Sequence, residues 1–395
     1  MAYRVSDFFN NYGSGVKLAA GIGGLSKPIT DTGILDYEMV PSLKNKYFHT
    51  NFHEGQFVLT TFLYAKDNPY LILDAVKHLA AKETSGLVIK NVFHLPIHDT
   101  VIRYADSRNF PIFIIDAADL YVERMIADIS RCIEKYDDMT YIQDELNRLL
   151  ITELSAAEIR VQAKKINPSY EEQFFHMYLK YGDEFNEACF LDCLRSYQNS
   201  SLDSCGSSLS YFKHGILFTY SSDNLAADEA EEVAASLQEL CPGTGDRTTP
   251  LLAAGVSDLH LTLAEYRESV YESMRSGLFF KGGSSEPVWY GNLGTYKVLL
   301  PFFQTREMTA FSRNILDGVL DYDAENGTQL FATLSCFVDC DCNIEQTASH
   351  MKQHKNTVRY RMDRITEITR RDYKRYSALE ELVLAVKIKR CGEMI

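Results

Sequence analysis

The sequence predicts a multidomain protein in which an α/β domain, a helical linker and a second α/β domain precede an all-α region. Short apolar runs alternate with helical patterns as far as about residue 280, whereas only amphipathic helical patterns follow Trp289. The 395 residues also exceed the roughly 100–200 residues of one typical domain. Apolar residues make up 46% and charged residues 24% of the chain, which is typical of a folded globular protein.

The first 118 residues alternate between strand and helix patterns, and we expect them to form an N-terminal α/β domain. Between the later apolar runs lie two segments, 69–83 and 95–109, whose apolar residues recur near helical spacing. Such alternation is typical of a parallel or mixed sheet with helices packed against it. The expected strands are 16–21, 56–61, 86–90 and 110–116.

A helical linker is expected over residues 119–165. This segment contains no Gly or Pro and is rich in Leu, Ile, Ala, Glu, Arg and Lys. It should form one or two long helices that end at the Asn167-Pro168 break, because proline disfavours helix at the residue before it. Such helices could join two domains or pair two chains.

Residues 166–285 show a second alternation, in the order strand, helix, strand, strand, helix, strand, helix. This order is the split βαβ or ferredoxin-like plan, and it predicts a second α/β domain. The expected elements are 173–181, 184–197, 209–214, 215–220, 227–240, 251–256 and 263–275.

Charge is distributed unevenly along the chain. In total, 40 Lys/Arg and 54 Asp/Glu give −14, which argues against a chain that binds nucleic acid or anionic membrane along its whole length. Residues 328–395 nevertheless contain twelve basic and nine acidic residues, so they carry +3 and residues 1–327 carry −17. Within residues 351–375, nine basic residues stand against three acidic ones. This distribution favours a nucleic-acid contact confined to the C-terminal segment.

Residues 343–369 have the spacing of a helix-turn-helix. Apolar residues recur at Ile344, Ala348 and Met351, and the same spacing repeats at 358, 362 and 365 after a short interruption. Asn343 is expected to cap the first helix, because its side chain can accept hydrogen bonds from the free amides of the opening turn. In a helix-turn-helix the second helix enters the DNA major groove by its N-terminal end.

The residues expected to contact DNA lie on the second helix, opposite or beside the apolar face of Val358, Met362 and Ile365. Asn can pair with adenine and Arg with guanine, and Thr can contact a base edge or the thymine methyl. Lys and the flanking arginines suit phosphates, which add affinity without reading sequence. Asp363 also faces outward and would repel phosphate, so only about the first two turns are expected to enter the groove. The candidate DNA-binding residues are Lys355, Asn356, Thr357, Arg359, Tyr360, Arg361 and Arg364.

The string HKNTVRYRMDRI, preceded by NIEQTA, resembles the C-terminal DNA-binding domain of the PucR/CdaR family of bacterial transcriptional regulators. Two departures are mild: Lys355 stands where the family often has Arg, and Gln353 where an apolar residue is usual. Residues 255–274 are similar to the closing part of the family's degenerate GGDEF-like domain, and the segments 19–29, 54–61 and 111–116 resemble its N-terminal sensory domain. The matching residues of the C-terminal motif are Asn343, Ile344, Thr347, Ala348, His354, Asn356, Thr357, Val358, Tyr360, Arg361 and Met362.

The resemblance implies a DNA-binding transcriptional regulator that responds to a small-molecule metabolite and controls a catabolic operon. Its partners would be a double-stranded DNA operator and an effector of unknown identity. A homodimer or higher homo-oligomer is expected, because a single recognition helix gives modest affinity. We expect no catalytic residues, no metal and no cofactor. The implied domains are sensory (1–118), linker (119–165), degenerate GGDEF-like (166–285) and C-terminal helical DNA-binding (286–395).

An enzyme of the nucleotide-cyclase class is the main alternative, because YGDEF at 181–185 is similar to the GGDEF motif of those enzymes. They carry that motif on the hairpin between the second and third strands. Here 181–185 falls between the first strand and the first helix, the expected hairpin is 211–218, and Tyr181 replaces the first glycine. A third hypothesis is a non-DNA scaffold that uses its basic end to bind an acidic protein.

The cysteines and glycines do not match a metal or dinucleotide motif. Cys336, Cys340 and Cys342 lie near two histidines, but C-x3-C-x-C is not the paired C-x2-C spacing of zinc sites. The glycines of residues 19–26 are not followed by a helix pattern, as a dinucleotide loop requires. There is no signal region, and no apolar run approaches the ~20 residues that span a bilayer. We therefore expect a cytoplasmic protein with reduced thiols and no membrane partner.

Overall fold

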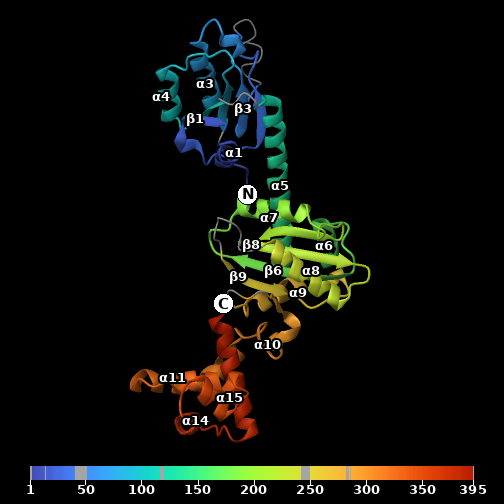
Figure 1. Cartoon of the computed structure of the whole chain (residues 1–395), viewed down its shortest axis with the longest axis vertical. Coiled ribbons are helices and arrows are strands. Elements are labelled where there is room, and N and C mark those ends of the chain that lie inside the picture. The colour runs from blue at the N-terminus through green and yellow to red at the C-terminus, as the bar shows by residue number, and fades with distance from the viewer. Residues whose placement is uncertain are drawn as a thin grey trace. The chain divides into compact units, whose positions relative to one another are not determined.

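The computed structural model describes residues 2–13, 15–40, 51–115, 120–241, 250–281, 284 and 286–394. The chain forms two compact units, Met1–Thr152 and Glu153–Ile395. Figure 1 shows a sheet covered by helices in the first unit, and a second sheet followed by a group of helices in the second unit. The predicted mixed α/β organisation with an all-α C-terminal region is confirmed.

A five-stranded sheet forms the centre of the first unit. Its order is β1-β5-β4-β3-β2; β2 to β5 run parallel, and β1 pairs antiparallel with β5. The four expected strands are present, and β2 is an additional one. Sequence reasoning missed β2 because it contains one large apolar residue, Ile34, and so has no apolar run. The strands are β1 (Val16–Ala20), β2 (Asp31–Ile34), β3 (Gln56–Thr60), β4 (Gly86–Lys90) and β5 (Ile112–Ile115).

Helices cover both faces of this sheet. The two predicted helices, α3 and α4, share a buried apolar cluster with Val58 of β3. On the other face α1, which was not predicted, places Phe8 against Phe57 with ring centroids 4.8 Å apart. Phe57 and Val58 are adjacent in one strand, so their side chains point to opposite faces. The helices are α1 (Val5–Tyr12), α3 (Leu71–Ala81) and α4 (Asp99–Ser107), and the short turns η1 (Ile22–Gly24) and η2 (Leu63–Ala65) complete the unit.

The predicted linker consists of two helices, α5 (Val122–Ile151) and α6 (Ala156–Ile166). α5 belongs to the first unit, where Asp128 accepts a hydrogen bond of 3.0 Å from the hydroxyl of Tyr12. α6 belongs to the second unit and begins with a capping box between Ser155 and Glu158. The linker is thus divided between the two units.

The second unit contains a sheet in the order β10-β9-β6-β8-β7. β6 pairs antiparallel with both β8 and β9, and β7 pairs antiparallel with β8. The predicted succession of strand, helix, strand, strand, helix, strand and helix is confirmed. β10 is a two-residue parallel edge strand, too short to leave a sequence pattern. The elements are β6 (Gln173–Tyr181), α7 (Glu187–Gln198), β7 (Ser207–Phe212), β8 (Gly215–Ser222), α8 (Ala227–Leu240), β9 (Leu251–Val256), η3 (Leu263–Glu265), α9 (Tyr266–Gly277) and β10 (Val288–Trp289).

A polar network around buried His260 joins this sheet to the helices that follow it. The ring nitrogens of His260 lie 2.9 Å from a carboxylate oxygen of Glu265 and 3.0 Å from one of Glu272. The same Glu272 oxygen accepts from the backbone amide of Asp258 at 3.1 Å. The carboxylate of Asp258 is in turn 2.7 Å from the ammonium of Lys297 at the start of the C-terminal helices. The network therefore links the end of β9, α9 and the next helix, α10 (Tyr296–Leu299).

Six helices after β10 form the all-α region. The first, α10, packs with the short turn η4 and with the C-terminal half of the last helix around Leu299, Leu300 and Ile388. The other helices share a separate core that includes Leu316, Leu334 and Val386. The elements are η4 (Tyr290–Leu293), α10 (Tyr296–Leu299), α11 (Arg306–Asn326), α12 (Leu330–Asp339), α13 (Ile344–His350), α14 (Lys355–Thr369) and α15 (Tyr376–Glu393). Among helices in the described parts of the chain, none has the length and apolar character needed to cross a membrane.

The His260 network should make the stability of the second unit depend on pH. Burial alone would lower the pKa of His260, but its hydrogen bonds to Glu272 and Glu265 outweigh burial and raise the pKa above 6.5. The His260 network therefore stabilises the folded state fully below about pH 6.5, the ordinary pKa of histidine. This stabilisation is lost as the pH rises through the higher pKa that His260 has in the folded state. We expect Glu272→Gln to lower the free energy of unfolding by about 2 kcal/mol near pH 6, and by much less near pH 9.

Urea unfolding followed by the fluorescence of Trp289 measures this effect locally. Trp289 is the single tryptophan of the chain, and its ring lies 6.2 Å from that of Phe175 in the same sheet domain. Glu232→Gln, at an exposed position of α8, is the matched control and should leave stability unchanged at both pH values. An equal loss for Glu272→Gln at both pH values would contradict the prediction.

Candidate nucleic-acid interface

The two helices of the predicted helix-turn-helix are α13 and α14. Asn343 caps α13, because its side-chain oxygen accepts from the amides of Glu345 at 2.8 Å and Gln346 at 3.1 Å, as predicted. The chain reverses at Lys352, whose φ of 53° is left-handed. The ring of His354 then caps α14 by accepting from the amide of Asn356 at 3.2 Å. Each of the two helices is thus capped at its N-terminus by the side chain of the residue that precedes it.

An apolar seam, formed by Ala348 of α13 and Val358, Met362 and Ile365 of α14, sets how α14 is rotated. The last three residues are fully buried and Ala348 is 6% exposed. They pack in one core with α11, α12 and α15. These were the residues predicted to face the core, and the small Ala348 lets the helices approach closely. The rotation of α14 about its axis is therefore determined by packing on three neighbouring elements.

The face of α14 opposite the apolar seam is open to solvent over its first two turns. Lys355, Asn356 and Arg359 are exposed, and Tyr360 is 71% exposed although it is a large aromatic residue. Thr357 is half-buried beside them. Five of the seven predicted DNA-binding residues therefore come together on this end of the helix. Exposed amide, guanidinium, hydroxyl and aromatic groups of this kind can contact base edges and the DNA backbone.

The other two predicted DNA-binding residues point toward protein groups. Arg361 donates a hydrogen bond of 3.0 Å to the hydroxyl of Thr333 on α12. Arg364 pairs with Glu367 and lies over the ring of Tyr322, 4.8 Å from its centroid. Their guanidinium groups therefore interact with other residues of the C-terminal helices. They do not belong to the open face of α14.

Asp363 is exposed, as expected, and its carboxylate interacts with two side chains from beyond α14. The ammonium of Lys374 lies 3.1 Å from its carboxylate, and the hydroxyl of Tyr373 lies 3.4 Å away. Lys355 is 3.9 Å from Glu345, at the outer limit of an ion pair. The negative charge that sequence analysis expected to repel phosphate is therefore paired with a cation from beyond the helix.

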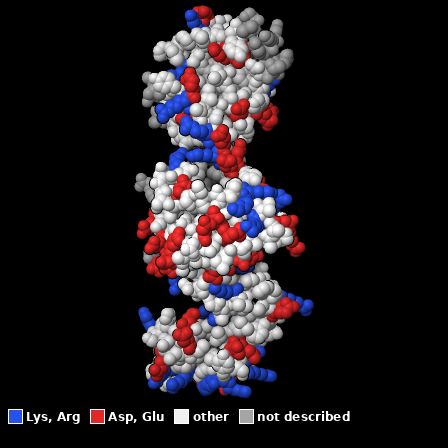
Figure 2. Space-filling view, turned by 90° about the vertical axis from the view of Figure 1, so that its right-hand side faces the viewer, with Lys and Arg blue, Asp and Glu red and all other residues white. Residues whose placement is uncertain are grey.

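Sequence reasoning missed three further exposed cations, which precede or follow α14 in the sequence: Lys352, Arg370 and Arg375. None of the three has an acidic partner among the residues that the structure describes. Figure 2 shows Lys and Arg side chains gathered on the outer end of the C-terminal helices. The basic run 351–375 contains all three residues and was the signal that could have indicated them. A helical wheel of α14 could not place them, because they lie outside that helix.

The two motifs considered for other chemistry are not assembled into sites. Within the described part of the chain, no three His, Cys, Asp or Glu side chains gather as they would around a metal ion. Burial and the neighbouring thiol of Cys340 raise the pKa of Cys336 to about 11, so this thiol is protonated at neutral pH. Gly21 lies in a tight turn against Phe110, where a Cβ atom would be 2.0 Å from the carbonyl oxygen, and no α-helix follows it.

The GGDEF-like string lies where sequence analysis placed it. Tyr181 ends β6, Phe185 stacks on it with ring centroids 4.4 Å apart, and Asp183 and Glu184 point to solvent before α7. The hairpin between β7 and β8 turns instead at Lys213 and His214, both with left-handed φ. The acids are thus on a different loop from the hairpin that carries them in cyclases.

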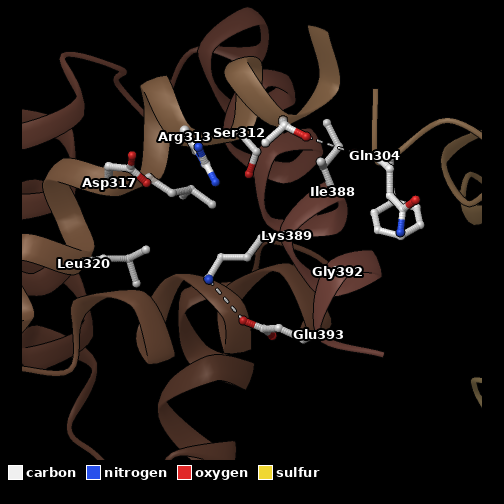
Figure 3. Close-up of a pocket in the computed structure, with 12 residues that line it drawn as sticks. Gln304, Ser312, Arg313, Asp317, Leu320, Ile388, Lys389, Gly392 and Glu393 are labelled. Atoms are coloured by element: carbon white, nitrogen blue, oxygen red, sulfur yellow. Dashed lines mark hydrogen bonds and ion pairs between the residues drawn. The ribbon is translucent and has the colours of Figure 1, made fainter. Parts of the chain in front are cut away.

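A groove of about 440 Å³ lies between α11 and α15. Arg313 and Asp317 line it from α11, and Lys389 and Glu393 line it from α15, where they pair at 3.2 Å (Figure 3). Its floor includes buried Leu316. None of the residues that line this groove belongs to α13 or α14, so it is separate from the open face of α14.

Comparison with known protein families assigns both ends of the chain. Residues 330–388 match the PucR C-terminal helix-turn-helix domain. Residues 10–133 match the purine catabolism regulatory protein-like family. The fold and the site thus define a protein with an N-terminal α/β domain and a C-terminal helix-turn-helix. Both ends of the chain are similar to PucR-type proteins, and the predicted resemblance to the PucR family is confirmed there.

Three similar proteins illustrate the extent of this likeness. The proline-responsive transcriptional activator PutR of Bacillus subtilis is 31% identical over 83 residues, 21% of this chain and 20% of PutR. The DNA-binding transcriptional activator AdeR of the same organism is 25% identical over 100 residues, 25% of this chain and 24% of AdeR. The aligned segments therefore span only about a fifth to a quarter of these relatives. The solved regulator of polyketide synthase expression from Bifidobacterium adolescentis is 16% identical and covers 65% of this chain and 99% of that chain, but its TM-score of 0.31 is too low to establish a common fold.

The hydrogen bond of Arg361 predicts that this residue contributes to stability. We expect Arg361→Ala to lower the free energy of unfolding by about 1–2 kcal/mol, because it removes a charged donor from the hydroxyl of Thr333. Arg359→Ala, two residues away on the exposed face, should change it by less than about 0.5 kcal/mol. Chemical unfolding of the full chain followed by circular dichroism compares the two, and equal losses would contradict this assignment.

Proposed function

We propose that this protein is a DNA-binding transcriptional regulator that responds to a small-molecule metabolite and controls a catabolic operon. The observation that carries the proposal is the open face of α14, where Asn356, Arg359 and Tyr360 are exposed on the N-terminal turns of the second helix. This is the end of a recognition helix that enters the major groove. Both Bacillus subtilis relatives are named as transcriptional activators, which supports a role in transcription.

The residues on the open face divide into base readers and backbone contacts. Asn356 would pair with adenine and Arg359 with guanine, since their side chains have the donors and acceptors for bidentate contacts in the major groove. Thr357 and Tyr360 lie beside them, where they can contact base edges or the thymine methyl. Lys355 would bind a phosphate, which adds affinity without reading sequence. Arg361 and Arg364 would act mainly by holding α14 in place.

The protein would bind its operator as a homodimer or higher homo-oligomer in the cytoplasm, where the DNA is. A single recognition helix gives modest affinity, and two copies read half-sites about one helical turn or more apart. An effector can change operator affinity only if it favours one placement of the two recognition helices over another. The operator is therefore expected to contain two related half-sites.

Each domain would have a separate role in effector-dependent DNA binding. Residues 1–118 would bind the effector, residues 119–165 would relay or dimerise, and residues 286–395 would bind DNA. Residues 166–285 would form a degenerate GGDEF-like domain of the ferredoxin-like plan. Its strand order β9-β6-β8-β7 supports that assignment, because the first and third strands lie in the middle of the sheet and the connections are those of the split βαβ unit.

We infer that the middle domain does not act as a nucleotide cyclase. Asp183 and Glu184 lie between β6 and α7, and the β7–β8 hairpin has Lys213 and His214 at its turn. With Lys213 and His214 at its two central positions, this turn lacks the carboxylates that would hold a metal and the paired glycines that would let the backbone approach a nucleotide. Incubation of the full chain with GTP and Mg²⁺ should yield no cyclic nucleotide by chromatography, and measurable product would contradict this inference.

The DNA-binding proposal predicts that the open face of α14 is required for sequence-specific binding. We expect Asn356→Ala/Arg359→Ala to weaken binding to a duplex selected by the wild-type chain from a randomised pool by about a hundredfold, because two base contacts are lost. Both residues are exposed, so the fold should stay intact. Fluorescence anisotropy at constant salt gives the affinities, and circular dichroism checks the fold.

The matched control is Arg313→Ala/Asn326→Ala, which makes the same two changes at exposed positions of α11. It should bind the selected duplex like the wild-type chain. Unchanged binding by Asn356→Ala/Arg359→Ala would overturn the proposal. It would favour the scaffold hypothesis, in which the basic end binds an acidic protein.

A further inference from the structure

The nine basic residues of segment 351–375 fall into three sets according to their partners. Arg361, Arg364, Arg371 and Lys374 each bond to a group within the helical region. Lys355 lies at the limit of an ion pair. The remaining four are exposed and have no acidic partner among the described residues. They are Lys352, Arg359, Arg370 and Arg375. Only part of the basic run is therefore available to a ligand, and half of that part lies beyond α14.

The two available cations beyond α14 sit on a segment that is fixed in place. Residues 370–375, named the return segment here, begin where Arg370 takes a left-handed φ of 56° at the end of α14. Arg371 anchors the segment to α15 through a bond of 2.6 Å to Glu381. Tyr373 is 9% exposed and packs edge-on against Phe337 of α12. Arg370 and Arg375 thus lie at the two ends of a segment that Arg371 and buried Tyr373 attach to the neighbouring helices.

The return segment also provides a cation that pairs with an acidic residue of α14. Lys374 lies 3.1 Å from Asp363, and Arg364 pairs with Glu367 of the same helix. Both acids of α14 are therefore neutralised by cations, so the helix presents no unpaired negative charge beyond its first two turns. The expectation that Asp363 would keep this part of α14 away from phosphate is thereby removed.

This inference rests on the proposed function. We propose that Arg370 and Arg375 form a second DNA-contact surface, which binds backbone phosphates on the opposite side of the major groove from Lys352. α14 has 15 residues and is about 22 Å long, whereas the groove is about 12 Å wide, so the two ends of the helix reach both flanking backbones. Arg375 is also the residue before α15, and the partial positive charge at the start of that helix adds to its attraction for phosphate.

The test is the salt dependence of DNA binding by the full chain carrying Arg370→Ala/Arg375→Ala. Two labelled duplexes of about three helical turns serve as probes, one selected by the wild-type chain and one of random sequence. We expect both affinities to fall by the same factor, because phosphate contacts do not read sequence. The plot of log affinity against log salt between about 50 and 200 mM should become less steep by about two, since two phosphates are lost.

The matched control is Arg306→Ala/Arg313→Ala, which removes two exposed arginines from α11 and should leave the slope unchanged. An unchanged slope for Arg370→Ala/Arg375→Ala would overturn the inference. If Asn356→Ala/Arg359→Ala still weakens binding to the selected duplex in that case, the proposed function stands. If the wild-type chain binds neither duplex, both fall.

A second comparison tests the ion pair of the return segment. Lys374→Ala leaves Asp363 without its cation, so it should weaken binding to the random duplex more than Lys374→Ala/Asp363→Asn does. Equal affinities for these two variants would show that no phosphate approaches Asp363, and the inference would fall. Circular dichroism of each variant separates this effect from a loss of folding.

Discussion

The apolar seam between α13 and α14 is the contact on which the rest of the C-terminal region depends. Burial of Val358, Met362 and Ile365 contributes about 1.5–3 kcal/mol for each side chain. The same burial determines which residues of α14 face solvent. Successive residues of a helix are about 100° apart, so a rotation by one position could turn Arg359 into the core and Val358 out of it. Stability and the exposure of the open face therefore have one physical cause.

Ion pairs and hydrogen bonds within the C-terminal helices determine which Lys and Arg side chains stay available to a ligand. Arg361 and Arg371 tie α14 and the return segment to their neighbours, whereas Arg359, Arg370 and Arg375 stay in solvent. The net charge of −14 is thus compatible with one basic surface on the C-terminal helices (Figure 2). Positions and partners of charges, rather than their sum, describe what this surface can bind.

Two contacts join the sheet of the second unit to the C-terminal helices, and they oppose movement of these helices relative to the sheet. Lys297 pairs with Asp258, and Asp258 shares Glu272 with buried His260. A second link is the apolar cluster of α10 with the end of α15. A movement of the C-terminal helices against this sheet would break at least one of these links, so it requires a ligand that favours the new arrangement.

The sequence by itself determined the elements whose patterns are local. Eight of the ten strands of the two sheets, the cap at Asn343 and the buried face of α14 follow from spacings within a few residues, and these were predicted. Short or weakly apolar elements such as β2 and β10 were missed, because pairing with neighbouring strands rather than local pattern stabilises them. Only the tertiary structure decided the partners of the charged residues. Arg361 bonds to Thr333, 28 positions earlier, and Lys374 folds back to Asp363. Local spacing cannot show such pairs, because they form only when separate helices pack together around a common core.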